Sequence, residues 1–371
     1  MKKMYLMVLV VLLLFGLAAC GNQQPAAEQA EPDVAENGEA DTGAWPAFDE
    51  KIYIGVSIRS LANPYHVAVA EGAELFAEAL RADGYDVEVV VLLSEGSDDK
   101  QISDIRALIA RGGQNTVFYV DPNNAPNSTV IAELLDDAGI YWASVWNLAE
   151  GTYPMDFNYW VAHNSPDDVQ AGYEIAVALF ESFDTPGVGT VLALEGMLAN
   201  TASQARVAGL HKALEEFPDV ELLDQQPADW DMTIALNTTE TWLSRFDDVD
   251  GIWAADDTMA LGVVTALQNA GRNGEIGVVG VAGTPEAVEA ILAGDMTATW
   301  DVNGMLQGFY VSAWALAAKL GVIDVATLPE SDRMFLTAGS LITADNADSI
   351  GETPDWDYTD LDFFNIGPML R

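Results

Sequence analysis

Carboxylates follow two apolar runs of the sequence, at the points where a strand would give way to a helix. Asp256 and Asp257 come directly after the run 252–255, and Asp121 comes directly after the run 116–120. In open α/β sheets ligands bind beyond the carboxyl ends of the strands, where such side chains can accept hydrogen bonds from hydroxyl groups. An Asp at this place also caps the next helix, so one such unit alone is ambiguous. Its repetition favours two similar halves with a small polar ligand between them.

Strands and helices alternate along the chain from residue 51, as expected of βαβ units on parallel sheets. A loop-rich passage at 147–168 separates a first series of units from a second. The helical stretch 305–320 and the run 334–343 then bring the chain back, so that several strands connect the halves. The expected strands lie at 52–58, 87–93, 116–120, 140–145, 188–194, 220–223, 252–255, 276–281 and 297–302.

The composition excludes several classes of partner. The 371 residues give room for two domains, and 15 Lys and Arg face 58 Asp and Glu, for a formal net charge of −43. Such a chain cannot neutralise a nucleic-acid backbone, nor dock through basic residues on an anionic membrane. A solvated acidic surface would keep the protein soluble and monomeric. Adaptation to high salt is a second explanation of the same charge.

The N-terminus has the features of an export signal. Two lysines precede the apolar stretch 5–17, which is too short for a membrane-spanning helix. The segment 17–20, Leu-Ala-Ala-Cys, resembles the bacterial lipobox, in which the cysteine is lipidated and becomes the first mature residue. Cys20 is the only cysteine, so the mature domain has no disulfide and no cysteine metal ligand. We therefore expect a signal peptide at 1–20 and a lipid anchor on the extracytoplasmic face of a membrane.

Residues 21–50 are expected to form a flexible acidic linker. They contain Asp and Glu among Ala, Gln, Gly and Pro, and no Lys or Arg. Such a segment cannot bury enough apolar surface to fold. The folded body would then be free to reorient near the membrane.

Residues in several places resemble the ribose-type (class I) periplasmic sugar-binding proteins, the solute-binding components of ABC importers. The resemblance spans about 51–345 and implies an α/β fold of the periplasmic-binding-protein type I, with two Rossmann-like domains joined by a three-strand hinge. The N-terminal lobe is expected at 51–163 plus 303–337, and the C-terminal lobe at 164–302 plus 338–371. The matching stretches are 55–58 (Gly-Val-Ser-Ile), 63–66 (Asn-Pro-Tyr-His), 226–231 (Gln-Pro-Ala-Asp-Trp-Asp), 256–262 (Asp-Asp-Thr-Met-Ala-Leu-Gly), 266–268, 279–280 and 283–285.

The resemblance also implies a function. Members of this family close two lobes over a ligand and deliver it to an importer. We therefore expect capture of a neutral monosaccharide or related polyol, with no cofactor and no metal. The expected partners are an ABC permease and its ATPase, with membrane contact only through the lipid anchor.

The same resemblance implies which residues hold the ligand. An aromatic clamp falls on Tyr65 and His66 from one lobe and on Trp230 from the other, and its rings would pack on the apolar C–H faces of a sugar. Carboxylates and an arginine fork would receive the hydroxyl groups around the rim. The polar contacts are expected from Arg59, Asn63, Asp121, Asn147, Arg206 and Asp256.

Three departures from the ribose binders change the expected ligand. An Asp-Arg pair of the family is Trp146-Asn147 here, a binding Asp is Ala282, and a glutamine position is Val302. The site has lost charged contacts and gained the aromatic surface of Trp146. Asp301 or Asn303 is expected to replace the lost glutamine. Ribose itself is therefore disfavoured, and a deoxysugar, a larger pyranose or a polyol would suit the site better.

Two alternative functions are a secreted glycoside hydrolase and a ligand-sensing lobe for a membrane sensor. A secreted glycoside hydrolase needs opposed carboxylates about 5–10 Å apart, whereas adjacent residues such as Asp256 and Asp257 point in different directions. The three histidines are widely spaced, and no Gly-x-Ser-x-Gly elbow or Gly-x-Gly-x-x-Gly loop is present. A ligand-sensing lobe for a membrane sensor would have the same folded module, and the sequence leaves that alternative open.

Overall fold

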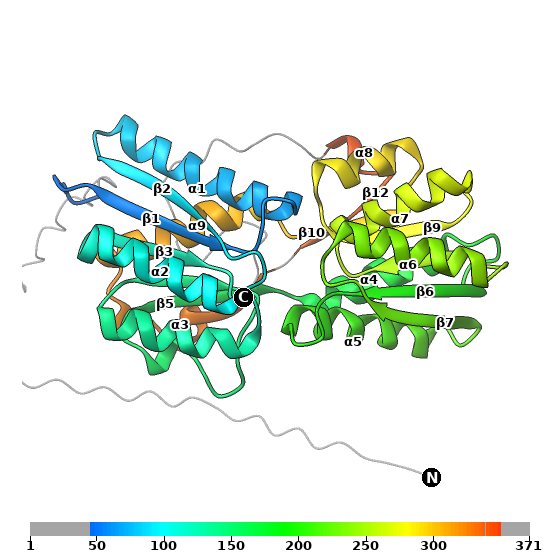
Figure 1. The fold of residues 1–371 in the computed structure, drawn as a ribbon, viewed down its shortest axis with the longest axis horizontal. Coiled ribbons are helices and arrows are strands. Elements are labelled where there is room, and N and C mark those ends of the chain that lie inside the picture. The colour runs from blue at the N-terminus through cyan, green and yellow to red at the C-terminus, as the bar shows by residue number, and fades with distance from the viewer. Residues whose placement is uncertain (1–44, 338, 350–371) are drawn as a thin grey trace, which may run out of the picture. The chain divides into compact units, whose positions relative to one another are not determined.

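Residues 45–337 and 339–349 are described by the structure, a computed structural model (Figure 1). The expected signal peptide with Cys20, the linker up to residue 44, and the part of the C-terminal lobe beyond residue 349 lie outside the described residues. Within the described ranges, no helix combines the length and the apolar character needed to cross a membrane.

Two six-stranded sheets form the framework (Figure 1). The first contains β1 (Ile52–Ile58), β2 (Val87–Leu93), β3 (Thr116–Val120), β4 (Trp142–Val145), β5 (Trp160–Pro166) and β11 (Met334–Thr337), in the order β11-β5-β4-β3-β1-β2. The second contains β6 (Gly189–Glu195), β7 (Val220–Pro227), β8 (Gly251–Ala254), β9 (Gly277–Ala282), β10 (Ala298–Asp301) and β12 (Ser340–Thr343), in the order β12-β10-β9-β8-β6-β7. Among the described strands, all neighbouring pairs are parallel except β10 with β12. The expected α/β fold with two mainly parallel, Rossmann-like sheets is confirmed.

Helices cover both faces of the first sheet. They are α1 (Pro64–Ala82), α2 (Asp98–Gly112), α3 (Ala125–Ala138) and α9 (Gly304–Lys319). Phe76 of α1 and Phe309 of α9 belong to one buried cluster, while Leu108 of α2 and Ile131 of α3 belong to another on the opposite face. We refer to this sheet and these helices as the first lobe.

The second sheet carries its own helices. They are α4 (Asp168–Glu181), α5 (Thr201–Glu216), α6 (Met232–Arg245), α7 (Asp257–Ala270) and α8 (Pro285–Ala293). In this group α4 packs on α5, and α6 packs on α7. We refer to this sheet and these helices as the second lobe.

The chain passes between the two sheets three times. It leaves the first sheet after β5 and returns between β10 and α9. The expected run 334–343 is divided, because β11 pairs in the first sheet and β12 in the second. A short helix, α10 (Glu330–Arg333), precedes β11.

One strand was missed by the sequence pattern. The expected loop-rich passage 147–168 contains β5, whose residues include His163, Asn164 and Ser165 instead of a continuous apolar run. Ser144 Oγ lies 2.9 Å from His163 Nδ1 and pairs with it, whereas the buried side-chain amide of Asn164 has no partner among the described residues. Burial lowers the pKa of His163 to about 4, so its ring is neutral in the folded protein. A periodicity of apolar residues cannot detect such a strand.

The expected linker also ends earlier than residue 50. Trp45 is buried, and its ring centroid lies 5.7 Å from that of Phe76. The Tyr85 hydroxyl donates a hydrogen bond of 2.8 Å to the carbonyl oxygen of Trp45. Lys319 Nζ lies 5.3 Å from the centroid of the Phe48 ring. The last residues of the expected linker therefore pack on the first lobe, because their aromatic side chains can bury surface that the acidic residues before them cannot.

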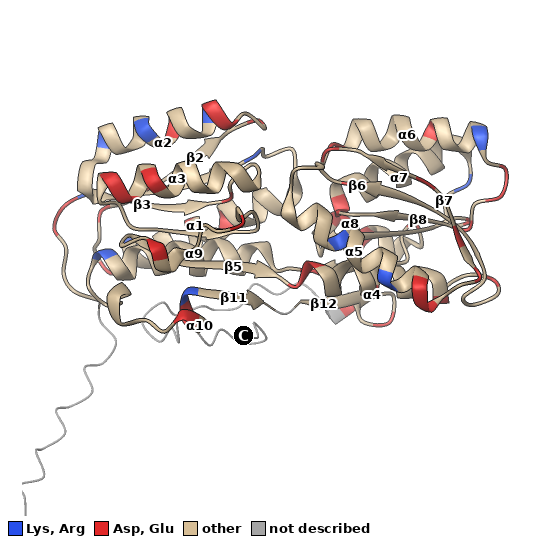
Figure 2. Ribbon diagram, turned by 90° about the horizontal axis from the view of Figure 1, so that it is seen from below, with Lys and Arg blue, Asp and Glu red and all other residues tan. Residues whose placement is uncertain are grey.

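Acidic residues are carried by helices and connecting segments of both lobes, with few basic residues among them (Figure 2). Several ion pairs are exposed, such as the one between Lys51 and Glu88 at 2.9 Å, and pairs of this kind contribute little stability. Two pairs among the described residues are buried: Arg206 with Asp168 at 2.8 Å, and His66 with Asp121 at 3.1 Å. Arg206, His66 and Asp121 all line one pocket.

Candidate ligand-binding site

Three helix caps converge on this pocket. Asn63 Oδ1 accepts from the backbone N–H of Tyr65 and caps α1, Asn200 caps α5, and Asp256 Oδ1 accepts from Met259 N at 2.8 Å and caps α7. All three caps also line the pocket. Parallel strands place the N-termini of the following helices at the carboxyl edge of each sheet, so capping and pocket lining are compatible roles.

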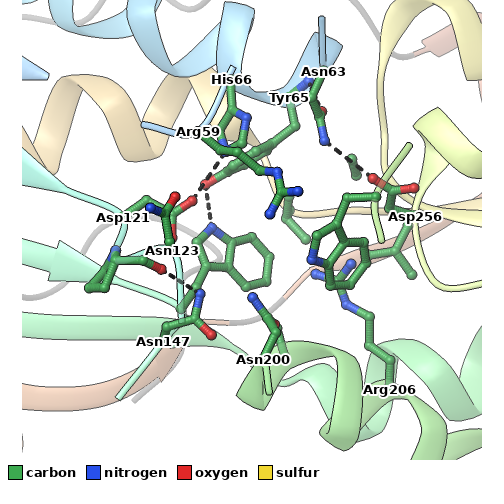
Figure 3. A pocket seen from close by; sticks show the side chains of 17 residues that line it. Arg59, Asn63, Tyr65, His66, Asp121, Asn123, Asn147, Asn200, Arg206 and Asp256 are labelled. Carbon is green, nitrogen blue, oxygen red and sulfur yellow. Dashed lines mark hydrogen bonds and ion pairs between the residues drawn. The ribbon is translucent and has the colours of Figure 1, made fainter. Parts of the chain in front are cut away.

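The pocket has an empty volume of about 600 Å³, which includes the open solvent at its mouth. Both lobes contribute side chains, as Figure 3 shows for the labelled residues. The lining residues are Arg59, Asn63, Tyr65, His66, Asp121, Pro122, Asn123, Trp146, Asn147, Asn200, Ala202, Arg206, Trp230, Asp256, Val281, Ala282 and Val302.

The structure brings together every expected ligand contact except Asp301. Asp301 is absent from the lining, and its Oδ1 accepts from the backbone N–H of Asn303 at 2.7 Å. Burial raises the pKa of this carboxyl to about 6. Asn303 is not a lining residue either; its side chain caps α9, and Val302, between Asp301 and Asn303, lines the pocket.

Sequence reasoning missed two polar lining residues, Asn123 and Asn200. Asn123 lies two positions beyond Asp121 in the segment after β3, and Asn200 directly precedes α5. The signal available for Asn200 was its place before a helix, which is typical of a cap. For Asn123 the sequence offered only a turn-forming segment, because the direction of its side chain depends on a partner from another strand end.

Two indole rings flank the guanidinium group of Arg206. Its Cζ lies 4.8 Å from the ring centroid of Trp146 and 5.7 Å from that of Trp230, distances typical of cation–π contacts. Trp146 and Trp230 both have positive φ, 64° and 61°. Such a backbone costs a non-glycine residue roughly 1–3 kcal/mol and is concentrated at ligand sites.

Gly196 leaves the space in which Trp230 lies. A Cβ atom at Gly196 would fall 2.1 Å from Cζ2 of the indole, closer than van der Waals contact allows. Because Gly196, directly after β6, has no side chain, the Trp230 ring can occupy this position and form one wall of the pocket.

Tyr65 is held through its hydroxyl group. The hydroxyl accepts from Trp146 Nε1 at 2.6 Å and donates to Gln307 Oε1. The Tyr65 and Trp146 rings meet edge to face with centroids 5.4 Å apart. Burial raises the pKa of Tyr65 well above its ordinary value, so the phenol stays neutral. The hydroxyl is thus used inside the lobe, and what Tyr65 can offer a ligand is its ring.

His66 orients Asp121. Its Nδ1 lies 3.1 Å from the Ser60 carbonyl oxygen and its Nε2 lies 3.1 Å from Asp121 Oδ2. The two ring nitrogens thus hold the imidazole between the Ser60 carbonyl oxygen and the Asp121 carboxyl group. This arrangement occupies one oxygen of Asp121 and leaves the other.

The remaining oxygen, Asp121 Oδ1, and the amide nitrogen Asn123 Nδ2 are buried and have no partner among the described residues (Figure 3). Ser94 Oγ donates to Asn123 Oδ1 at 2.6 Å, which orients the amide with Nδ2 left over. Buried polar groups are almost always paired, so unpaired polar atoms on two residues that line one pocket favour a polar ligand there. A hydroxyl group both donates and accepts, so ligand hydroxyl groups can pair with atoms of either kind.

Asn147 bridges protein groups instead. Its Nδ2 donates to the Pro122 carbonyl oxygen at 2.8 Å (Figure 3), and its Oδ1 accepts from the Thr201 N–H at 3.2 Å. These bonds connect the first lobe to the start of α5 in the second. Its position at the pocket is as expected, but both ends of its amide are already engaged.

The charges around the pocket nearly balance. Arg206 Nε binds Asp168 and its Nη1 donates to the Ala255 carbonyl oxygen at 2.7 Å. Arg59 reaches the second lobe, where it contacts Met197 Sδ and donates to the Asp229 carbonyl oxygen at 3.4 Å. Asp121 and Asp256 offset these two cations. No cluster of His, Cys, Asp or Glu suited to a metal ion occurs within residues 45–337 and 339–349.

A family model for the periplasmic binding protein domain matches residues 54–321. The chain belongs to the periplasmic binding protein family. It is 32% identical over 249 residues to the D-allose-binding periplasmic protein of Escherichia coli (strain K12), covering 66% of this chain and 77% of the relative. It is 31% identical over 299 residues to a xylitol-binding protein of Mycolicibacterium smegmatis, covering 80% and 78%.

Among solved structures, a twin-arginine translocation pathway signal protein from Burkholderia phytofirmans is similar, with a TM-score of 0.78 and 38% identity. The similarity covers 81% of this periplasmic binding protein and 92% of that chain. The resemblance to ribose-type sugar-binding proteins is confirmed. The relatives are solute-binding proteins, and this chain is likewise not an enzyme.

Proposed function

We propose that this periplasmic binding protein captures a neutral monosaccharide or a related polyol between its lobes and delivers it, unchanged, to an ABC importer. The observation that carries the proposal is that Asp121 and Asn123 each have one buried polar atom without a partner among the described residues and line a pocket that also has indole walls. The relatives named for binding D-allose and xylitol support a ligand rich in hydroxyl groups.

In this proposal the two kinds of lining group have separate tasks. The rings of Tyr65, Trp146 and Trp230 pack on C–H faces of the ligand, while hydroxyl groups meet the polar collar. The balanced charge of the pocket favours a ligand without net charge. The ring of His66, whose two nitrogens are already engaged, is proposed as part of the aromatic clamp. The proposed polar contacts are Arg59, Asn63, Asp121, Asn123, Asn147, Asn200, Arg206 and Asp256.

The proposed lobes are 51–163 plus 303–337 and 164–302 plus 338–371, with β5 extending the first to residue 166. Ligand would favour closure of the lobes only through contacts with both of them. Lining residues come from both sheets, which supports such a mechanism.

We also propose that Cys20 carries a lipid that anchors the mature chain on the extracytoplasmic side of a membrane. Mass spectrometry of the membrane-extracted N-terminal peptide would give the mass of a diacylated Cys20. Release of Cys20→Ala into the soluble fraction would agree with this. Retention of that variant in the membrane would contradict it.

The ligand proposal is tested by isothermal titration calorimetry of the soluble chain from residue 21, which lacks Cys20 and keeps the packed Trp45. A panel of neutral monosaccharides and polyols should contain at least one ligand that binds with one-to-one stoichiometry and raises the melting temperature by mass action. Sugar acids and amino acids serve as charged comparisons. Binding only to charged solutes, or to none of the panel, would reject the proposal.

A further inference from the structure

The second lobe presents an apolar wall to the pocket. Val281, Ala282 and Val302 line it at the ends of β9 and β10, and none of them has a side-chain donor or acceptor. Val281 is fully buried and Val302 is 4% exposed, so the wall is not a solvated rim. The backbone N–H of Val302 donates to the Ala282 carbonyl oxygen at 3.4 Å, which holds the two residues together.

The first lobe presents the opposite chemistry. Asp121 is 9% exposed and Asn123 is 5% exposed, and each has one buried polar atom with no partner among the described residues. Their other polar atoms are fixed by His66 and Ser94, so neither side chain can turn away to pair elsewhere at no cost. A ligand that binds this lobe is therefore expected to direct hydroxyl groups toward Asp121 and Asn123.

Two polar side chains of the second lobe already have partners within the protein. Arg206 binds Asp168 and the Ala255 carbonyl oxygen. Asp256 accepts from Met259 N and from Asn63 Nδ2. A ligand hydroxyl directed at Val281, Ala282 and Val302 would lose its bonds to water, and none of these three side chains could replace them, whereas a methyl or methylene group would gain from burial there.

We infer that the solute is a deoxy sugar, with hydroxyl groups toward Asp121 and Asn123 and a methyl or methylene group toward the wall of Val281, Ala282 and Val302. This inference rests on the proposed function, because it assumes that the ligand is a sugar or polyol. It adds that one carbon of the ligand lacks a hydroxyl group.

Matched sugars that differ by one hydroxyl group test the inference by titration calorimetry. The pairs are D-fucose with D-galactose, L-rhamnose with L-mannose, and 2-deoxy-D-ribose with D-ribose. In at least one pair that binds, the one whose missing hydroxyl group would face the wall, the deoxy member should bind about 10- to 100-fold more tightly. The inference is overturned if the hydroxylated members bind as tightly or more tightly, or if the tightest ligand of the full panel carries an oxygen on every carbon.

The two failures are distinguishable. Absence of binding by every sugar and polyol rejects the proposed function and the inference with it. Binding that favours hydroxylated sugars rejects the inference alone and leaves the proposed function standing.

Variants of the wall give a second test. Val302→Thr is nearly isosteric and adds a hydroxyl group, so the preference for the deoxy member should fall by about threefold to tenfold. Val302→Ala keeps the wall apolar and should keep the preference. Asn123→Ala removes a contact to hydroxyl groups that both sugars share, so both affinities should fall by the same factor. Equal effects of Val302→Thr and Val302→Ala on the preference would contradict the inference, and Ala282→Ser provides a second added hydroxyl group if Val302→Thr does not fold.

Discussion

Asn63 Nδ2 donates a hydrogen bond to Asp256 Oδ2 across the pocket, at 3.2 Å (Figure 3). Each of the two residues is also the N-cap of a helix, α1 in the first lobe and α7 in the second. The bond therefore joins two helix N-termini that belong to different sheets. Asp256 uses Oδ1 for its cap and Oδ2 for Asn63, and each oxygen keeps a lone pair that can accept from a ligand hydroxyl.

Asp256→Asn should weaken ligand binding while leaving the fold intact. The asparagine keeps an oxygen for the Met259 N–H, and Asn and Asp are comparable caps. It replaces Oδ2 by an NH₂ group that faces another donor on Asn63. We expect affinity to fall about 10- to 100-fold, the range for a hydrogen bond to a charged group, as measured by calorimetry.

Asp231→Asn is the matched control for that variant. Asp231 caps α6 through the Ile234 N–H, is exposed and does not line the pocket. Its affinity for the ligand should equal that of the parent chain. An unchanged affinity in Asp256→Asn as well would mean that Asp256 does not contact the ligand.

Gly196→Ala should weaken binding through Trp230. The new Cβ would collide with the indole and displace one wall of the pocket, and loss of a well-placed aromatic contact reduces affinity by about threefold to tenfold. In a Trp230→Ala background the same substitution should have no further effect, because the ring that it displaces is gone. A titration of the four proteins in this cycle measures the coupling.

Gly151→Ala controls for the general cost of replacing a glycine. Gly151 has φ +80° and no atom within 4 Å of an added Cβ, so an alanine there strains the backbone without touching the pocket. It should lower the melting temperature and leave affinity unchanged. Additive losses of affinity in the double variant would refute a role for Gly196 in placing Trp230.

The net charge of −43 predicts a stability that depends on salt. Like charges repel in the compact state, and 1 M salt shortens the screening length to about 3 Å. Sodium chloride raised from 0.05 M to 1 M should increase the melting temperature by several degrees, and sucrose of equal osmolality should produce a smaller rise. A melting temperature independent of salt would show that repulsion among the acidic residues is already negligible.

Buried parallel strands were the part of the fold that the sequence predicted most accurately. The run 116–120 coincides with β3, and 252–255 matches β8 within one residue, because strands covered on both faces are nearly continuous apolar segments. The expected strand 220–223 stops short of β7, which continues through polar residues to Pro227 at an edge of the sheet. β5 contains buried polar residues, so it lacks the continuous apolar run by which β3 and β8 were predicted.

The site was predictable where position alone determines proximity. Asp121 follows a strand of the first sheet and Asp256 follows a strand of the second, so each lies at the carboxyl edge of its own sheet, where ligands bind in open α/β folds. Asn123 was missed because its orientation depends on Ser94, a residue that precedes it by 29 positions. The positive φ of Trp146 and Trp230 could not be predicted from the sequence either, since tryptophan has no preference for a left-handed backbone.

Asp257 predicts how stability changes with pH. Its Oδ1 accepts from Thr299 Oγ1 at 2.6 Å and its Oδ2 accepts from Thr284 N at 2.9 Å. Burial outweighs these bonds and raises the pKa of the carboxyl to about 7, against about 3.9 in an unfolded chain. Between these two values the folded protein holds a proton that the unfolded chain has released. The free energy of unfolding therefore falls as the pH rises from about 4 through 7, and the stabilisation is fully present only on the acidic side.

Asp257→Asn should remove this part of the pH dependence, because the amide resembles the protonated carboxyl at every pH. Urea unfolding of the parent chain at pH 5 and pH 8 should show a loss of roughly 2–3 kcal/mol attributable to this residue, and the variant should show a correspondingly smaller loss. Burial also raises the pKa of Asp168 and of Asp301 to about 6, so part of the slope should persist in the variant. Asp231→Asn, at an exposed cap, should keep the parent slope. Identical slopes in Asp257→Asn and the parent would mean that the Asp257 carboxyl is already ionised across this range, and that its hydrogen bonds to Thr284 and Thr299 outweigh its burial.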